Sequence, residues 1–411
     1  MSTKTTYKQT ELGLIPTDWD FDNMGNLSKV NQGLQIPISD RFSEQVENSL
    51  FYITNEFLKE DSKNKYFIKN PPKSVIANKD DVLMTRTGNT GKVVTGVEGA
   101  FHNNFFKIKY DETKLNKDFL VGYLKSPRTQ YSILTLSGNS TIPDLNHSDF
   151  YRIKIPLPPL PEQKKIADCL STWDVAIEKQ SQLINALTDR KKALMQQLIT
   201  GKKRLPGFSD EWKEVKLGSL GKTYNGLTGK TKEDFGEGKP FITYMNIFSN
   251  PKINISNFEY VKMGVNENQN KAIYGDIFFT VSSETPNEVG MASVLLDEIN
   301  DLYLNSFCFG FRLNDFKNLL PEFSSYLFRN DLFRKDVYKL AQGSTRFNLS
   351  KLELMKIKIK LPSLSEQTAI AEILATADRE LTLQKEKLAQ LQTLKKGLMQ
   401  VLLTGKKRLI N

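Results

Sequence analysis

The chain repeats itself, and this repeat constrains the fold more than any other feature of the sequence. The pattern Leu-Pro-x-Leu-x-Glu-Gln at residues 157–163 recurs at residues 361–367, a shift of 204 positions. The same shift carries Ser140 through Leu205 onto the second copy without a gap, and about half of the residues from Leu157 onwards are identical. Chance does not produce such a match, so one structural unit is present twice.

Each copy of the pattern introduces a long amphipathic helix. Glu162 and Glu366 fall in the first turn, where an acidic side chain suits the helix dipole, and Gly201 and Gly405 supply the C-terminal stop. Apolar residues advance by alternating steps of four and three, which is the spacing of a heptad seam. The predicted seam consists of Ile166, Leu170, Trp173, Ile177, Ile184, Leu187, Leu194 and Leu198 in the first helix and Ile370, Leu374, Leu381, Leu388, Leu391, Leu398 and Leu402 in the second.

The narrowness of this stripe favours pairing of the two helices with each other. It runs for roughly 37 residues, about 55 Å of helix, and Gln180, Lys191, Gln384 and Lys395 interrupt it at the same two places in both copies. The alternative is two ordinary amphipathic helices in separate cores, which would show wider apolar faces. We therefore expect an antiparallel coiled coil within the chain, whose polar seam residues help to fix the register.

The segments before each helix resemble one another more loosely. Residues 16–19 match 206–212, and Asp81–Thr85 matches Asp276–Thr280. Short β-branched and aromatic runs, broken by Gly, Asn and Pro, predict strands and loops there. We predict an α+β protein with an internal pseudo-twofold repeat, in which mixed α/β modules at 1–155 and 205–360 are separated by the spacer helices at 156–204 and 361–411.

The amino-acid composition indicates the cellular compartment of the protein and the kind of partner that it binds. The 57 Lys and Arg residues outnumber the 47 Asp and Glu residues, and a net charge of +10 favours polyanions such as nucleic acid. Only two cysteines occur, which suits a reducing cytosol. The first residues carry no apolar signal segment, and no apolar run is long enough to span a membrane. We expect a cytoplasmic protein.

Several motifs together resemble the specificity subunits of type I restriction–modification enzymes, along essentially the whole chain. They are the doubled Leu-Pro-x-Leu-x-Glu-Gln, the two Thr-Gly-Lys-Lys-Arg-Leu endings, the Pro-x-x-Trp opening, and the loops at 88–92 and 283–290. Each motif alone is unspecific, but their doubled order is highly specific. The resemblance implies that each module is a target-recognition domain that reads one half of a bipartite DNA site, with the helical spacer setting the gap.

The resemblance also implies partners and places the cofactors outside this chain. Two methyltransferase subunits would clasp the spacer and modules, and motor–nuclease subunits would join for restriction. The methyl donor, ATP and Mg²⁺ would bind to those partners. From the residues themselves, His102 and His147 do not combine with Cys169 or Cys308 in a metal-ligand spacing, and no complete phosphate-binding loop occurs. We expect neither a catalytic nor a metal site.

The best candidates for DNA contacts are loops rich in Gly, Ser, Thr, Asn, Lys and Arg, because small residues let the backbone approach phosphates and the polar side chains can read base edges. In the first module these residues are Thr85, Arg86, Thr87, Asn89, Thr90, Lys92, Asn139, Ser140 and Thr141. In the second module they are Thr228, Lys230, Tyr244, Asn246, Ser282, Ser283, Gly343, Ser344, Thr345 and Arg346.

Two alternatives remain open at this point. Each of these loops could be an ordinary solvated turn, and the chain as a whole could be a non-catalytic coiled-coil adaptor without sequence-specific DNA binding. An adaptor would not need two elaborate basic modules, so the sequence favours the DNA-reading interpretation.

Overall fold

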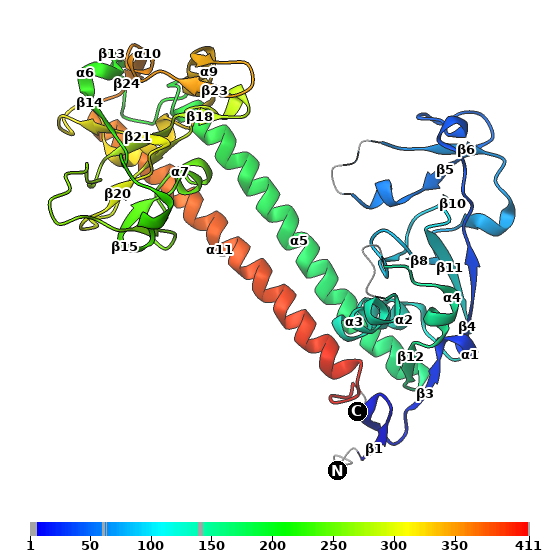
Figure 1. Ribbon diagram of the computed structural model, residues 1–411. Helices are drawn as coiled ribbons and strands as arrows, with labels where there is room; N and C mark the ends of the chain where they lie inside the picture. Colours follow the sequence, from blue (N-terminus) through cyan, green and yellow to red (C-terminus); the bar gives the residue numbers. More distant parts are fainter. Residues whose placement is uncertain (1–5, 60–61, 63, 139–142, 410–411) are drawn as a thin grey trace. The chain divides into compact units, whose positions relative to one another are not determined.

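The structure, a computed structural model, describes residues 6–59, 62, 64–138 and 143–409. The chain forms two compact units, residues 1–181 with 386–411 and residues 182–385. Each unit therefore contains one module, part of the first long helix and part of the second (Figure 1). No helix in the described part of the chain is long and apolar enough to cross a membrane.

The first unit is built on two four-stranded sheets. One is antiparallel, in the order β4-β11-β8-β9, and the other has the order β6-β5-β10-β7, in which β5 and β10 are parallel. Figure 1 shows β4, β11 and β8 side by side. The strands of the two sheets are β4 (Ser28–Gln32), β5 (Ser49–Ile53), β6 (Phe67–Lys69), β7 (Ile76–Ala77), β8 (Val82–Thr85), β9 (Val93–Val94), β10 (Gly99–Phe101) and β11 (Phe105–Tyr110).

Shorter elements complete this unit around its core. Two-stranded pairs are formed by β1 (Tyr7–Thr10) with β2 (Gly13–Pro16) and by β3 (Asp20–Asn23) with β12 (Lys154–Leu157). The short helices are α1 (Met24–Leu27), η1 (Ile38–Asp40), η2 (Asn55–Leu58), η3 (Lys73–Val75), α2 (Lys117–Lys125), α3 (Pro127–Leu136) and α4 (His147–Tyr151). The largest apolar cluster joins Trp19, Phe106 and Phe119 of the module to Ile166 and Leu402 of the long helices.

The second unit repeats the arrangement with different details. Its antiparallel sheet has the order β14-β21-β17-β19, and a second sheet pairs β15 in parallel with β20 and antiparallel with β16. Those strands are β14 (Gly221–Asn225), β15 (Phe235–Ile242), β16 (Glu259–Val261), β17 (Ile277–Thr280), β19 (Ala292–Val294), β20 (Tyr303–Leu304) and β21 (Cys308–Leu313).

Further elements close the second module. A three-stranded sheet has the order β18-β23-β22, and β13 pairs with β24. These strands are β13 (Lys213–Lys216), β18 (Ser282–Ser283), β22 (Ala341–Gln342), β23 (Phe347–Leu349) and β24 (Lys358–Leu361). The helices are α6 (Leu217–Leu220), η4 (Lys232–Asp234), α7 (Tyr244–Ser249), η5 (Pro286–Glu288), α8 (Pro321–Leu327), α9 (Asp331–Lys339) and α10 (Lys351–Leu354).

The two long helices are α5 (Leu160–Leu198) and α11 (Leu364–Leu402), and they pack together as the sequence predicts. Lys395 of α11 forms an ion pair with Asp174 of α5 in the first unit, and Lys191 pairs with Asp378 in the second. Positions rise along one helix as they fall along the other, so the pairing is antiparallel. Every predicted seam residue is buried or half-buried, and so are the four polar residues that interrupt the seam.

Both helices end as their glycines predict. Gly201 and Gly405 adopt left-handed φ values of 68° and 71°. The N–H of Lys203 then reaches back to the carbonyl of Gln197, and that of Lys407 reaches the carbonyl of Val401. These bonds satisfy carbonyls that the helix end would otherwise leave free.

Candidate nucleic-acid interface

The first predicted loop connects β8 to β9 and is tightly built. Gly88, Asn89 and Gly91 have φ values of 62°, 72° and 84°, in the left-handed region that glycine and asparagine tolerate best. Thr85 is fully buried, and its hydroxyl accepts from the N–H of Lys92 at 2.8 Å and donates to the carbonyl of Asn89 at 2.5 Å. Thr85 therefore supports the loop from below, while Asn89 and Lys92 are exposed on it.

Arg86 opens this loop as one half of a bidentate ion pair. Its Nε and Nη2 donate to the two carboxylate oxygens of Asp144 at 3.0 and 2.6 Å. Those hydrogen bonds raise the pKa of the guanidinium above its usual value. The next residues are tied as well, since Asn55 donates to the carbonyl of Thr87 and the Thr90 hydroxyl donates to the carbonyl of Pro143. Asp144 is an element of this site that the sequence did not reveal.

Three predicted residues of the first module, Asn139, Ser140 and Thr141, lie outside the described part of the chain. Their neighbour Pro143 lies against the first loop through the Thr90 contact. The structure thus brings the chain that follows residues 139–142 up to the loop at 85–92.

In the second module, the predicted residues of two segments meet in one small sheet. Ser282 and Ser283 form β18, which pairs with β23, and β22 and β23 flank the hairpin that carries Gly343, Ser344, Thr345 and Arg346. Gly343 has a φ of 131°, and a Cβ there would lie 2.2 Å from the carbonyl oxygen of Arg346, so this tight hairpin requires glycine. The hairpin residues 343–346 are exposed, whereas both serines are buried.

Two other predicted residues of this module serve the protein interior. Tyr244 donates its hydroxyl to the carbonyl of Ser282 at 2.8 Å. Asn246 is fully buried, and its amide donates to the carbonyls of Asn254 and Asn257, each at 2.9 Å. Sequence composition did not distinguish these supporting side chains from exposed ones.

The segment with Thr228 and Lys230 lies against another loop, residues 262–269. Thr228 binds the side chain of Gln269, and the Lys230 amine donates to Glu267 at 2.5 Å and to the carbonyl of Lys262 at 2.6 Å. Hydrogen bonds from the Gly264 N–H and then from Lys230 lower the pKa of Glu267 to about 2. Lys230 is held by these contacts, and only 8% of its side chain is exposed.

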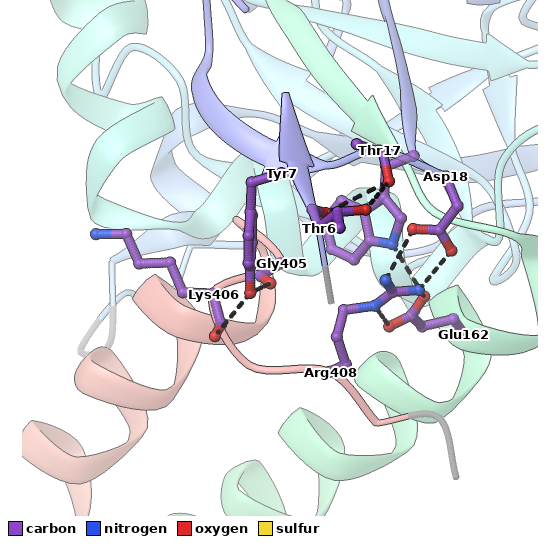
Figure 2. Close-up of polar contacts among 9 residues, drawn as sticks. Thr6, Tyr7, Thr17, Asp18, Glu162, Gly405, Lys406 and Arg408 are labelled. Atoms are coloured by element: carbon purple, nitrogen blue, oxygen red, sulfur yellow. Dashed lines mark hydrogen bonds and ion pairs between the residues drawn. The ribbon is translucent and has the colours of Figure 1, made fainter. Parts of the chain in front are cut away.

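In each unit, an arginine and a tryptophan donate hydrogen bonds to the glutamate in the first turn of the long helix. We call this cluster the clasp. In the first unit, Arg408 donates to Glu162 at 2.6 Å through both Nε and Nη2, and to Asp18 at 2.8 Å (Figure 2). The buried Trp19 indole also donates to Glu162, at 2.9 Å. Glu162 and then Asp18 raise the pKa of Arg408. The chain end is held further by Tyr7, whose hydroxyl donates to the carbonyl of Gly405 (Figure 2).

The second unit has the same clasp without the additional aspartate bonds. Arg204 donates to Glu366 at 2.7 and 2.8 Å, and the Trp212 indole donates to Glu366 at 3.2 Å. In both units the motifs that were recognised in sequence, the tryptophan, the helix-start glutamate and the basic ending, therefore contact one another.

Metal-ligating groups and cysteines were expected to form no site in this chain. Within the described ranges, no group of three or more His, Cys, Asp and Glu residues could hold a metal ion. Cys169 is half-buried and Cys308 buried, and burial raises the pKa of the Cys308 thiol. Cys308 therefore lacks the low pKa and the exposure of a cysteine used in nucleophilic catalysis.

Comparison with known proteins places this architecture. Residues 16–189 and 209–393 match the family model of the type I restriction modification DNA specificity domain. The type I restriction enzyme MjaVIII specificity subunit of Methanocaldococcus jannaschii is 28% identical over 97% of this chain and 95% of its own length. The type I restriction enzyme EcoKI specificity subunit of Escherichia coli is 24% identical, over 65% of this chain and 59% of its own.

Solved structures share the fold. A chain from a study of complex assembly and conformational transition of the type I restriction–modification system has a TM-score of 0.61 at 18% identity, covering 96% of this chain and 99% of its own. The S subunit of a type I restriction–modification system from M. genitalium has a TM-score of 0.56 at 18% identity, covering 93% and 96%.

Proposed function

Since the chain belongs to the type I restriction–modification DNA specificity family, as a non-catalytic subunit with two target-recognition domains, we propose that each module reads one half of a bipartite target in double-stranded DNA. The observation that carries the proposal is the duplicated scaffold with different loops. The antiparallel sheets β4-β11-β8-β9 and β14-β21-β17-β19 correspond, while the loops on them differ in length and composition. Two related frames with different loops suit two different half-sites.

We assign direct DNA contact to six of the exposed and half-exposed polar residues of the predicted loops. In the first module these are Arg86, Asn89 and Lys92, and in the second they are Ser344, Thr345 and Arg346. Amide, hydroxyl and guanidinium groups read base edges, and lysine pairs with phosphate. The buried Thr85, Asn246, Ser282 and Ser283 act as supports in this proposal, as does Tyr244. Asn139, Ser140 and Thr141 remain candidates for contact.

The helix pair serves as spacer and platform in the same proposal. The recognition domains comprise residues 1–155 and 205–360, and the spacer segments comprise residues 156–204 and 361–411. Two methyltransferase subunits dock on the spacer and modules, and motor–nuclease subunits join them for restriction. The methyl donor, ATP and Mg²⁺ belong to those partners.

Methylome sequencing of the host, with and without the gene for this chain, tests the function. We expect one split, adenine-methylated motif that disappears on deletion and returns on complementation. Gel-shift binding by the purified chain with its methyltransferase partner should then show preference for that motif. A complex that assembles normally but leaves no motif in the methylome would favour the adaptor alternative.

A lengthened spacer tests whether the helices set the gap. The ion pairs of Asp174 with Lys395 and of Lys191 with Asp378 give the antiparallel register. One heptad inserted after Ile184 and another after Gln384 would therefore face each other and keep the seam in phase. Each helix gains about 10.5 Å, or roughly three base pairs at about 3.4 Å each.

We expect both half-site sequences to be retained while the unread gap between them grows. A four-residue insertion at the same points is the control, because it breaks the heptad phase. An active lengthened enzyme that still methylates the original spacing would contradict the ruler and leave the helices as a docking platform only.

A further inference from the structure

In each module, one loop makes the same set of contacts with the residues around it, although the two loops differ in length and sequence. We call residues 86–91 the first specificity loop and residues 281–290 the second. At the base of each, a buried threonine ends a strand and closes the loop with its hydroxyl. Lys92 donates its N–H to the Thr85 hydroxyl at 2.8 Å, and Met291 donates to the Thr280 hydroxyl at 2.9 Å. The threonine N–H groups return to the carbonyls of Lys92 and Met291, each at 3.0 Å.

A glycine ends each loop against a helix of its own module. Gly91 and Gly290 have φ values of 84° and 63°. A Cβ at Gly91 would lie 2.7 Å from Ile133 of α3, and one at Gly290 would lie 2.8 Å from Val337 of α9. The two helix residues are separated by the same 204 positions as the repeat. Loop and helix are therefore fitted together in the same way twice.

One side chain of each helix donates a hydrogen bond to the carbonyl of that glycine. Gln130 donates to the carbonyl of Gly91 at 2.9 Å, and Arg334 donates to the carbonyl of Gly290 at 2.6 Å. These two residues are again 204 positions apart. They lie at equivalent places and make equivalent contacts with different chemistry.

A second side-chain hydrogen bond fixes the start of each loop. Asn55 donates to the carbonyl of Thr87 at 3.0 Å, and Tyr244 donates to the carbonyl of Ser282 at 2.8 Å. Each donor directly follows the threonine that caps the short helix there, Thr54 or Thr243. The backbone of each loop is thus fixed at both ends by side chains from outside it.

The number of hydrogen-bond donors on the helix side chain matches the length of the loop that it binds. The second loop is the longer of the two, and Arg334 also donates to the carbonyls of Asn287 at 2.8 Å and Val289 at 2.7 Å. Gln130, which serves the shorter loop, donates its second bond to the carbonyl of Leu124 in α2, at 2.6 Å. A guanidinium has five donors in a rigid fork, whereas a neutral amide has two. Arginine can therefore organise more carbonyls than glutamine can.

We propose that Gln130 and Arg334 are positioning residues, each for the base discrimination of one half-site. Gln130 sets the conformation of the first specificity loop, which carries Arg86 and Asn89. Arg334 sets that of the second specificity loop, whose strand β18 pairs with β23, the strand that follows the exposed hairpin at residues 343–346. This inference rests on the proposed reading of two half-sites. Ordering a flexible loop costs conformational free energy, and a loop already ordered avoids that cost when DNA binds. An ordered loop also rejects a wrong base more sharply, because its donors and acceptors cannot shift to suit another base edge.

The test measures discrimination separately in the two half-sites. The full chain is assembled with its methyltransferase partner and titrated with duplexes that carry the target mapped by methylome sequencing, or that target with one base pair changed in either half. Gln130→Ala should lower discrimination in the first half-site about tenfold, within the range of a lost base contact, and leave the second unchanged. Arg334→Ala should do the converse.

Conservative and matched variants separate positioning from general effects. Arg334→Gln keeps a donor for Gly290 alone, so its discrimination should fall between wild type and Arg334→Ala. Lys339→Ala and Ser132→Ala change exposed side chains on the same two helices without touching the loops, and they should leave discrimination unchanged. Lys339 also controls for the loss of a positive charge.

Two glycine variants test the close packing of the first specificity loop against α3. Gly91→Ala and Gly96→Ala both place a side chain at a left-handed φ, 84° and 74°, but only the Cβ at residue 91 meets a neighbour. Both variants should lower the melting temperature, and only Gly91→Ala should lower discrimination in the first half-site.

The outcomes are decisive in each direction. Equal loss in both half-sites, complete loss of binding, or a lower melting temperature with discrimination intact would each overturn the positioning role. A wild-type complex without sequence preference would instead overturn the proposed function, and the positioning role would fall with it.

Discussion

The two modules use the same contacts with different degrees of burial, and the clasps at their bases show this most clearly. In the first unit, Arg408 has 9% of its side chain exposed and pairs with two carboxylates, those of Glu162 and Asp18. In the second, Arg204 is 28% exposed and pairs with Glu366. Duplication thus kept the ion pair and the tryptophan but allowed the solvation of the arginine to diverge. The cost of breaking each clasp should differ accordingly.

The largest expected effect is on local stability, from removing the central glutamate of each clasp. Glu162→Ala would leave the buried Trp19 indole without its acceptor and Arg408 with Asp18 alone, at about 3 kcal/mol. Glu366→Ala should cost about 1–2 kcal/mol, because Arg204 is exposed enough to be hydrated. Hydrogen exchange of the segments around residues 19 and 408, or 204 and 212, gives the two opening free energies.

Glu162→Gln and Glu366→Gln are the controls, since an amide oxygen still accepts from the indole. They should be milder than the alanine variants. Equal costs for the two alanine variants would show that the difference in solvation has no energetic consequence.

The next effect concerns DNA and compares Arg86 with Arg346. Each alanine variant should weaken binding by about 1–3 kcal/mol and relax its own half-site if the guanidinium reads a base. Arg86→Ala should be the more costly, because it leaves the Asp144 carboxylate uncompensated near DNA phosphates. Binding to duplexes with substitutions in one half at a time provides the measurement.

The double variant Arg86→Ala with Asp144→Asn isolates that repulsion and should recover part of the loss. Uniform weakening over all sequences would identify the arginine as a phosphate contact. No change at all would identify its loop as a solvated turn.

A smaller effect is expected in the helix seam. Lys191 pairs with Asp378, which also accepts from the Tyr326 hydroxyl at 2.8 Å, whereas Asp174, the partner of Lys395, is 62% exposed. Lys191→Leu should therefore cost about 1 kcal/mol, while Lys395→Leu should be close to neutral. Thermal denaturation of the two variants compares them, and the reverse order would contradict the importance of the Tyr326 network.

The smallest effect is a pH dependence of the first clasp. The hydrogen bond from Arg408 lowers the pKa of Asp18 below its usual value. A lowered pKa in the folded state gives stability that is present above the unfolded pKa, near 4, and is lost as the pH falls through the folded pKa. Because Asp18 is 52% exposed, solvent screening limits the effect to less than about 1 kcal/mol.

Melting curves from pH 6 to pH 3, compared with those of Asp18→Asn, measure this contribution. The wild-type advantage over the variant should shrink on acidification. An advantage that stays constant across this range would show that ionisation of Asp18 does not stabilise the clasp.

The seam and the repeat were predictable because helix periodicity is a local property. A stripe of period three and four determines which side chains face a partner helix, and each predicted seam residue is indeed buried or half-buried. Because the same stripe occurs in both copies of the repeat, the second long helix was the best candidate partner for the first. The glycine stops were readable for the same reason, since a left-handed helix end needs glycine wherever the helix lies.

The candidate loops were chosen by their composition, which did not separate exposed side chains from buried ones. Thr85 and Asn246 share the chemistry of exposed readers, yet both are fully buried and bind loop backbone. Thr85 ends strand β8, in which successive side chains point to opposite faces, so an error of one residue exchanges an exposed side chain for a buried one. Asn246 lies in helix α7 rather than in a loop. The supports Gln130 and Arg334 lie just before the stretch in which the two copies match without gaps, so similarity did not mark them.

Three properties of this protein could be read from the order of its residues: the duplication, the pairing seam of the long helices, and the kinship with DNA-specificity proteins. They depend on periodicity and on motif order, which survive in one dimension. Which side chains meet became visible only in the folded chain. Arg86 finds Asp144 at a sequence separation of 58, and Arg408 finds Glu162 at 246. Contacts over such separations form when strands and helices fold back on one another, and no local pattern of residues encodes them.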